Sequence, residues 1–301
     1  MNEPHPLAEK RYNATLTNFK LITPYLAIFH IKPDFPIPEF KAGQFATLGL
    51  GSWEKRVSGA QEELKIKENF LGRRAYSIST PIFSEDGNIA DPANLPYLEF
   101  YVTLVLDGKD EEHAPYLTPR LFNLEIGDRL SIVPKISGHY VLEDIHKEDI
   151  LVFLATGTGQ APHNSMACEL LRQGHKGKII LVECNRSSDM FGYSEKLQAL
   201  EENFSNVHYK RLMTREGENP MRIQPYIENG LLEKEFDLTI DRKNTKVFLC
   251  GNPAMIGIPK FEGEYPTFEQ KGGVVELLVN KYHMKIHHGH SPGEIYYEKY
   301  W

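Results

Sequence analysis

The chain is poor in cysteine and has no long apolar run. Its 301 residues include only three cysteines, Cys168, Cys184 and Cys250. So sparse and odd a set argues against a disulfide-stapled fold and indicates a reducing compartment, so we expect a cytoplasmic protein. It also excludes a built-in iron–sulfur cluster, which needs several closely spaced thiolates. The longest apolar runs, such as 150–155, are too short to cross a bilayer.

An excess of basic residues is also missing. The chain has 34 lysines and arginines against 41 aspartates and glutamates, for a formal net charge of −7. Proteins that bind nucleic acid generally carry a basic excess, and so do segments that dock on anionic membranes. We therefore expect neither partner. The N-terminal residues show no basic start followed by an apolar segment, so no secretory signal is expected.

The composition is that of an ordinary globular protein. Hydrophobic residues make up 41% of the chain and charged residues 25%, and no internal repeat is visible. A length of 301 residues favours two domains. The pattern of apolar residues changes near Lys147, which predicts one domain at 1–147 and another at 148–301.

The first predicted domain is rich in β-strand signals. Short segments of strand-forming residues, separated by Gly, Pro and Asp, favour an antiparallel barrel or sandwich. The expected strands are 42–50, 74–79, 98–106 and 130–133. Polar or glycine- and proline-bearing stretches resemble insertions and are expected to be surface loops; they are 51–72, 84–94 and 257–273.

The second predicted domain alternates strands with helices. Compact apolar strands are expected at 149–155 and 178–184, and further strands at 207–213 and 246–250. Helical stretches follow the first two strands, one ending near Arg172 and one covering 194–202. This alternation predicts a doubly wound α/β domain around a parallel sheet.

A glycine-rich turn follows the first strand of that domain. The segment 157–162 reads G-T-G-Q-A-P and leads into a helix. Glycines at such a turn let the backbone approach a pyrophosphate, whose charge suits a helix N-terminus. Because residue 162 is proline, the full G-x-G-x-x-G fingerprint is absent, and a plain tight turn is the alternative. The strand–turn–helix context favours a nucleotide site.

A second motif, Arg74–Ala75–Tyr76–Ser77, lies on a predicted barrel strand. An arginine can neutralise a cofactor phosphate, a tyrosine can lie along an aromatic ring, and a serine hydroxyl can bond to a flavin edge. Taken alone, the motif fits an ordinary barrel strand equally well.

A third motif, C-G-N-P-A-M at 250–255, follows the predicted strand 246–250. The carboxyl end of a parallel strand faces the ligand crevice of such a sheet. The alternative is a buried structural cysteine followed by a turn.

In this order and spacing, R-x-Y-S, G-T-G-x-A-P and C-G-x-x-x-M resemble the motifs of the ferredoxin–NADP+ reductase family, and the ending 298–301 is similar to that of some bacterial members. The resemblance covers roughly 18–301, apart from the insertions. It implies an antiparallel FAD-binding barrel followed by an NADP-binding α/β domain. It also implies an enzyme that moves electrons between NADPH and ferredoxin or flavodoxin, by hydride transfer to or from the flavin N5.

The family resemblance also implies a set of flavin contacts. These residues are Arg74, Tyr76, Ser77, Tyr101, Thr118 and Trp301. Ser77 would lie near the flavin N5, Thr118 would contact the FAD pyrophosphate, and Trp301 would cover part of the FAD. Such an aromatic C-terminus is poorly suited to exposure in water. Ser77, Cys250 and Glu298 would act in catalysis, with Cys250 against the nicotinamide and Glu298 near the flavin.

For NADP(H), the resemblance implies contacts from Gly157, Thr158, Gly159, Gly251, Met255, Arg186, Arg215 and Arg222. The three arginines match those that bind the 2′-phosphate in bacterial reductases. A 2′-phosphate needs cationic partners, and the guanidinium fork suits it, so NADPH is preferred over NADH.

Several features depart from the family pattern or stay ambiguous. Gln160 stands where an isoleucine or similar residue is common. The mixed charges of 55–74 would form either a basic patch that steers an acidic carrier or a solvated loop. Four histidines, His283, His287, His288 and His290, lack an accompanying cysteine or carboxylate pattern, so we expect no metal.

Two alternatives to a stand-alone reductase remain at this point. The first is a flavin reductase or the reductase component of an oxygenase, although such components often carry an iron–sulfur domain of their own. The second is a non-catalytic electron-transfer or NADP-binding subunit of a complex. A fold does not by itself decide among these functions.

Overall fold

The structure is a computed structural model that describes residues 5–65, 67–263, 265–289 and 291–300. The chain forms two compact units. The first consists of Met1–Pro81 with Ala90–Val141, and the second of Ile82–Ile89 with Leu142–Trp301.

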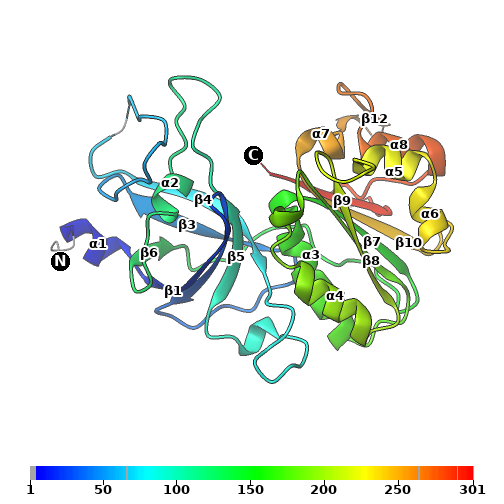
Figure 1. The fold of residues 1–301 in the computed structure, drawn as a ribbon, viewed down its shortest axis with the longest axis horizontal. Helices are drawn as coiled ribbons and strands as arrows, with labels where there is room; N and C mark the ends of the chain where they lie inside the picture. Colours follow the sequence, from blue (N-terminus) through cyan, green and yellow to red (C-terminus); the bar gives the residue numbers. More distant parts are fainter. Residues whose placement is uncertain (1–4, 66, 264, 290, 301) are drawn as a thin grey trace. The chain divides into compact units, whose positions relative to one another are not determined.

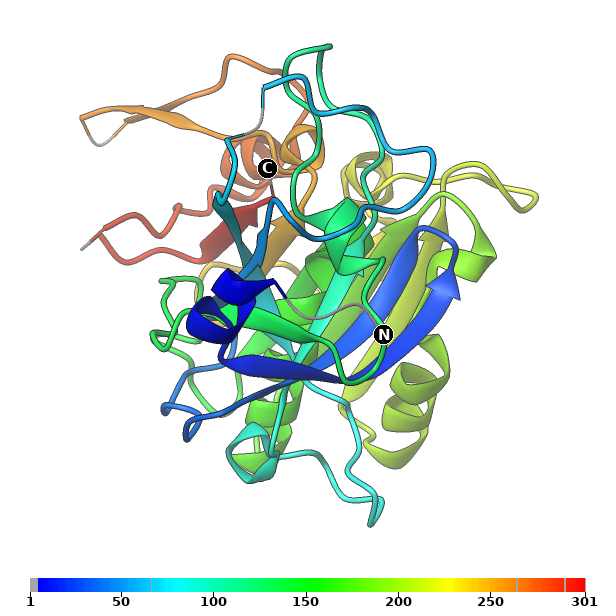
Figure 2. The same ribbon diagram turned by 90° about the vertical axis from the view of Figure 1, so that its left-hand side faces the viewer.

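The first unit is a closed antiparallel barrel (Figures 1 and 2). Its strand order is β1-β2-β5-β4-β3-β6. The elements of this unit are α1 (Pro6–Arg11), β1 (Ala14–Thr23), β2 (Leu26–Pro33), β3 (Phe45–Gly51), β4 (Leu71–Ser79), a 3-10 turn η1 (Pro92–Asn94), β5 (Leu98–Thr103), α2 (Thr118–Leu121) and β6 (Arg129–Ile132). The predicted choice between barrel and sandwich is thus settled as a barrel.

The barrel core follows the two-residue period of its strands. On β3, Ala46, Leu48 and Leu50 are all fully buried, and the residues between them face the other side of the strand. Phe29 of β2 and Phe122, just after α2, meet edge-on with ring centroids 5.3 Å apart. The residues around α2 therefore belong to the barrel core, which fixes the segment that follows β5.

Several barrel strands end at other residues than predicted. The strand expected at 42–50 starts only at Phe45, because a turn with Gly43 at φ 95° precedes it. The strand expected at 98–106 ends at Thr103, since the Val105 N–H turns away to the Thr118 hydroxyl. Strands β1 and β2 were not predicted, because β1 mixes buried and exposed residues without a clean alternation.

The second unit is built on a five-stranded parallel sheet, with the order β13-β10-β7-β8-β9 (Figure 1). Its strands are β7 (Ile150–Thr156), β8 (Ile179–Asn185), β9 (Val207–Met213), β10 (Thr245–Gly251) and β13 (Ile295–Lys299). The predicted strands are all present. β13 was not predicted, although its residues extend the sheet beside β10.

Helices cover both faces of this sheet, as a doubly wound fold requires. They are η2 (Gly157–Gly159), α3 (Gln160–Arg172), η3 (Ser188–Met190), α4 (Ser194–Asn203), α5 (Ile223–Glu228), α6 (Leu231–Glu235), α7 (Pro253–Ile256) and α8 (Val274–Tyr282). Val152 and Leu154 pack in one core with residues of α5 and α8. Phe153, between them on β7, faces α3 instead, where its ring lies 5.1 Å from that of His163.

The stretch 257–273 was predicted to be a surface loop, and this prediction is wrong. It contains a short hairpin of β11 (Lys260–Glu262) and β12 (Tyr265–Thr267), which projects from the second unit in Figure 2. Across the described ranges, no helix is long and apolar enough to span a bilayer.

Candidate functional site

The connections of the parallel sheet place two predicted motifs together. From β7 the chain proceeds to β8 and β9 on one side, and then returns to β10 on the other side of β7. The carboxyl ends of β7 and β10 therefore flank the point where the strand order reverses, which is where open α/β sheets bind ligands. Gly157–Gly159 follows β7, and Cys250 and Gly251 end β10.

Glycines bring these two strand ends into backbone contact. A Cβ at Gly159 would lie 2.3 Å from the carbonyl oxygen of Cys250. A Cβ at Gly251, whose φ is +122°, would lie 2.4 Å from the Thr156 hydroxyl oxygen. That same hydroxyl accepts a hydrogen bond of 2.8 Å from the Asn252 N–H. Side chains at either glycine would push the two turns apart, so these positions require glycine.

The turn after β7 also fits a pyrophosphate. Gly157 has φ +55°, and no protein atom lies within 4 Å of the place where its Cβ would be. The helix that follows has thirteen residues, and its N-terminus carries the positive end of the helix dipole. Pro162 lies in that first turn, where a missing N–H removes no helical bond. Open space beside the start of a helix suits a phosphate group.

Gln160, the residue that departs from the family pattern, leaves this turn intact. Its side chain is fully buried, and its Nε2 donates to Asn164 Oδ1 at 2.9 Å, one helical turn along α3. The substitution is therefore accommodated within the helix. Thr158, beside it in the turn, is also buried.

Cys250 and Glu298, two of the predicted catalytic residues, are direct partners across β10 and β13. The Cys250 side chain is fully buried, and burial, with the Glu298 charge adding to it, raises the pKa of the thiol well above its ordinary value. The thiol therefore stays protonated near neutral pH and offers a compact, unreactive surface. Trp301 lies outside the described residues.

The three predicted phosphate-binding arginines gather near the ends of β8 and β9. The Arg215 N–H donates to the Arg186 carbonyl at 3.0 Å, which joins the loops after these strands. Arg222 precedes α5, and the neighbouring Met221 N–H returns to the Met213 carbonyl at 2.7 Å. All three arginines are exposed. Their charges are thus available to an anionic group at this edge of the sheet.

Sequence reasoning missed a buried carboxyl beneath these loops. Glu183 on β8 is fully buried and accepts hydrogen bonds from Tyr209 Oη at 2.8 Å and Asn185 Nδ2 at 2.9 Å. Asn185 Nδ2 also donates to the Met190 carbonyl, which fixes the loop that carries Arg186. Burial raises the Glu183 pKa to about 7. A glutamate within the apolar run of β8 was the available signal.

In the barrel, the flavin motif occupies β4 as predicted. Tyr76 and Ser77 pair with Ala46 and Phe45 of β3. Ser77 is buried, whereas Arg74 is exposed and its guanidinium donates to the Arg73 carbonyl. Burial raises the pKa of the Tyr76 phenol, which therefore stays neutral. An exposed cation next to a neutral aromatic ring suits a phosphate joined to a planar ring system.

Two further predicted flavin residues lie on other barrel elements. Tyr101 is buried on β5, where it pairs with Ile28 of β2. Thr118 starts α2, and its hydroxyl oxygen accepts from the Val105 N–H at 3.1 Å. This hydrogen bond joins the start of α2 to the beginning of the long segment after β5.

Some of the charges at 55–74 are in ion pairs. Arg56 Nε lies 3.9 Å from Glu63, and Lys65 Nζ lies 2.8 Å from Glu112. Arg73 and Arg74 are exposed.

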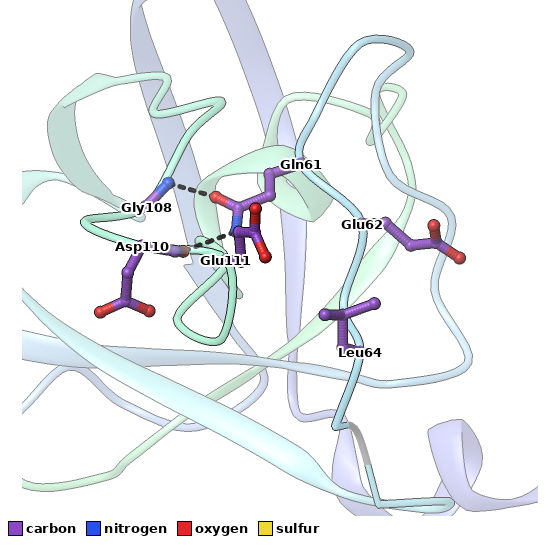
Figure 3. Close-up of a pocket in the computed structure, with 6 residues that line it drawn as sticks. All are labelled: Gln61, Glu62, Leu64, Gly108, Asp110 and Glu111. Carbon is purple, nitrogen blue, oxygen red and sulfur yellow. Dashed lines mark hydrogen bonds between the residues drawn. The ribbon is translucent and has the colours of Figure 1, made fainter.

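A cavity of about 400 Å³ lies between two barrel loops (Figure 3). Its lining residues are Gln61, Glu62, Leu64, Gly108, Asp110 and Glu111. None of these residues is a predicted site residue, and the carboxylates of Glu62, Asp110 and Glu111, with no cation among the lining residues, make the cavity unsuitable for a phosphate group.

The histidine-rich stretch is built into the second unit through ring contacts. His287 stacks on Tyr296, with centroids 4.6 Å apart, and its Nε2 lies 3.5 Å from Glu143. His288 stacks on Phe261 at 4.0 Å, and His290 lies outside the described residues. Wherever the chain is described, no group of three or more His, Cys, Asp or Glu side chains is arranged to hold a metal ion.

Comparison with known proteins gives consistent matches. Residues 153–260 match the model of the oxidoreductase NAD-binding domain family. The flavodoxin/ferredoxin–NADP reductase of Escherichia coli is 32% identical over 235 residues, covering 76% of this chain and 81% of that protein. The flavodoxin/ferredoxin–NADP reductase of Buchnera aphidicola is 29% identical over 285 residues, covering 91% and 93%.

A solved structure matches over the same length. The ferredoxin NADP+ reductase from Neisseria gonorrhoeae, with bound FAD and NADP, superposes with a TM-score of 0.71. The match covers 96% of this chain and 98% of that one, at 22% identity. At this identity the likeness establishes the fold, which is a barrel followed by a parallel-sheet unit.

Proposed function

The chain belongs to the family of flavodoxin/ferredoxin–NADP reductases, and we propose that it is a FAD-dependent enzyme that moves electrons between NADPH and ferredoxin or flavodoxin. The observation that carries this proposal is the meeting of the G-T-G and C-G turns at the switch point of the sheet. The names of the relatives favour this function over a flavin reductase, an oxygenase component or a non-catalytic subunit.

The barrel would hold FAD through β4 and its neighbours. Arg74 would neutralise a phosphate of the cofactor, Tyr76 would lie along the flavin ring, and Ser77 would donate a hydrogen bond near N5. Tyr101 and Thr118 would complete the contacts, with Thr118 near the pyrophosphate. Bound FAD supplies an N5 atom that exchanges a hydride with NADPH and a ring system that exchanges single electrons with the carrier.

The α/β unit would hold NADPH at the carboxyl edge of its sheet. The turn at Gly157–Gly159 and the start of α3 would bind the pyrophosphate. Cys250 would pack against the nicotinamide as a neutral thiol, and Glu298 would place a carboxyl beside it. The shape and polarity of this edge orient the reacting ring, while the chemistry belongs to the cofactors.

The three arginines near β8 and β9 would select NADPH over NADH by binding its 2′-phosphate. Arg186, Arg215 and Arg222 are exposed and lie on segments joined by backbone hydrogen bonds. A phosphate monoester is the ligand that their guanidinium groups suit best.

The electron carrier would be an acidic protein. Arg73 is exposed on β4 and would attract it, as charge complementarity steers encounter between proteins. We place the enzyme in the cytoplasm, because Cys168, Cys184 and Cys250 are buried thiols and not disulfides, which suits a reducing compartment.

The test is a spectrum followed by an assay. The purified protein should be yellow, should release FAD on denaturation, and should reduce added ferredoxin or flavodoxin when NADPH is supplied. A colourless protein that takes up no FAD would refute the proposal. A yellow protein that reduces free flavin but neither carrier would support the flavin reductase alternative instead.

A further inference from the structure

The loop between β3 and β4, residues 52–70, is fastened to the segment that follows β5, residues 104–117. The Val57 N–H donates to the Pro119 carbonyl at 2.9 Å, and the Gln61 N–H donates to the Leu106 carbonyl at 2.8 Å. Both views of the ribbon show the two stretches side by side (Figures 1 and 2). These backbone hydrogen bonds hold the loop in a defined position, so we infer that it is more than a surface connection.

The Gln61 carboxamide fastens the tip of the second stretch. Its Oε1 accepts from the Gly108 N–H at 2.6 Å, and its Nε2 donates to the Asp110 carbonyl at 2.7 Å, as Figure 3 shows. A Cβ at Gly108 would lie 1.7 Å from the His113 carbonyl oxygen, so this turn is tight enough to require glycine. One side chain thus satisfies two backbone groups of a turn that cannot widen.

Glu63 fastens the other end, at α2. Both of its carboxylate oxygens accept from the Arg120 guanidinium, at 2.8 Å and 2.6 Å. The Arg120 side chain is 2% exposed and also donates to the Tyr116 carbonyl at 2.8 Å. A buried guanidinium without a carboxylate is costly, so Glu63 determines where Arg120 and the start of α2 can lie.

Tyr116 ties the fastened segment to the base of the loop. Its hydroxyl lies 3.1 Å from the carbonyl oxygens of both Leu50 and Phe70, which share its one hydrogen. Its ring covers Gly72, where a Cβ would lie 2.0 Å from a ring carbon. The loop, the entry to β4 and the segment before Thr118 therefore form one connected structure.

We propose that the loop 52–70 is a clasp for the adenosine half of FAD, with Glu63 and Gln61 as its positioning residues. The inference rests on the proposed function. The clasp links the beginning of β4, the strand that carries Arg74, to α2, which begins at Thr118, and both residues are predicted to meet FAD phosphates. It does so through residues that lie outside the predicted contacts of the flavin ring. Loosening it should therefore release the part of FAD beyond the first phosphate.

The test compares FAD with FMN, which lacks the adenosine half. Apoprotein is titrated with each flavin for the wild type and for Glu63→Gln, and the quenching of flavin fluorescence gives the dissociation constants. Glu63→Gln should weaken FAD binding about tenfold and leave FMN binding unchanged. The matched control is Asp34→Asn, which removes a carboxylate from the Arg129 fork elsewhere in the same unit. This control should change neither constant.

Three outcomes would overturn the clasp. Glu63→Gln weakens FAD and FMN equally, it weakens neither, or Asp34→Asn reproduces its effect. Should Glu63→Gln fail to fold, Gln61→Ala replaces it with the same expected selectivity for FAD. If the wild-type protein binds no FAD, the proposed function is refuted. If the wild type binds FAD and Glu63→Gln binds it equally well, only the clasp is refuted.

Discussion

The two units build their candidate sites in different ways. In the α/β unit, backbone topology and glycines bring Gly159 and Cys250 into contact, and both lie in recognisable sequence motifs. In the barrel, the residues of β4 are framed by side chains from distant segments, such as Glu63 and Arg120, which are 57 positions apart. A site made by backbone contact is sensitive to one methyl group, whereas a site made by side chains depends on charge and hydrogen bonding.

The sharpest way to break this comparison is to add a methyl group at Gly159. Gly159→Ala places a Cβ against the Cys250 carbonyl, so the turns after β7 and β10 must separate. We expect the KM for NADPH to rise about a hundredfold, because displacements near 1 Å at a binding turn have effects of that order. FAD content should not change. Gly174→Ala, at a glycine with positive φ and open space, is the control and should leave KM unaltered.

Glu183 tests whether the α/β unit also depends on a buried charge. Its folded-state pKa of about 7 lies above the ordinary value of 4.5, so the folded protein holds the proton more tightly than the unfolded chain. Its contribution to stability therefore falls as pH rises from about 4.5 to 7. The Glu183→Gln variant lacks this ionisable group and does not suffer the loss. The free energy of unfolding of the variant, relative to that of the wild type, should therefore rise by about 2 kcal/mol between pH 5 and pH 7.

Urea unfolding of both proteins at pH 5, 6 and 7 measures that difference. Glu235→Gln is the control, since the Glu235 carboxylate also accepts from a tyrosine but is partly exposed to water. This control shows how much the loss of a tyrosine-bound carboxylate outside the core changes the free energy of unfolding. Parallel curves for Glu183→Gln would contradict the buried-charge account.

Substituting Arg215 tests whether the α/β unit also uses side-chain charge, at the predicted 2′-phosphate site. Arg215→Gln removes one cation from the predicted 2′-phosphate site without touching the glycine turn. The KM for NADPH should rise about tenfold while the KM for NADH stays the same. Arg242→Gln, which removes an arginine paired with Glu294, is the matched control. Equal losses for both nucleotides would show that Arg215 supports the loop rather than the phosphate.

The smallest effect is expected for an exposed ion pair of the barrel loop. Lys65 and Glu112 lie 2.8 Å apart, but their side chains are 68% and 62% exposed. Lys65→Gln should change the free energy of unfolding by less than about 0.5 kcal/mol, because water screens such pairs. Thermal unfolding of Lys65→Gln and of Glu63→Gln, measured in parallel, compares the exposed Lys65–Glu112 pair with the buried Glu63–Arg120 pair.

Much of the second unit was predictable from local sequence. Strand β9 was predicted at 207–213, where it lies, and the G-T-G turn follows β7 as expected. β7 is a short apolar run that leads into glycine, and β9 begins with alternating buried and less buried residues, so local sequence was enough to predict both. Strand β13 was not predicted, because it is defined by its long-range pairing with β10, and the aromatic residues near the end of the sequence do not indicate that pairing.

Less of the barrel site was predictable. The motif on β4 was recognisable, but the interplay of Glu63 with Arg120 was not, since a charge in a polar insertion normally faces water. The mixed-charge stretch 55–74 illustrates the same limit, because Arg56 and Lys65 find carboxylates in different segments. Which charges pair and which stay exposed is decided by tertiary contacts alone.

We propose that one chain holds FAD in its barrel and takes NADPH at the switch point of its sheet. The most direct measurement is the anaerobic absorbance of the FAD-loaded protein after mixing with NADPH and, separately, with NADH. The flavin bands should bleach fast with NADPH and slowly with NADH. Equally fast bleaching by NADH would contradict the assignment of the three arginines, and no bleaching by either nucleotide would contradict the claim itself.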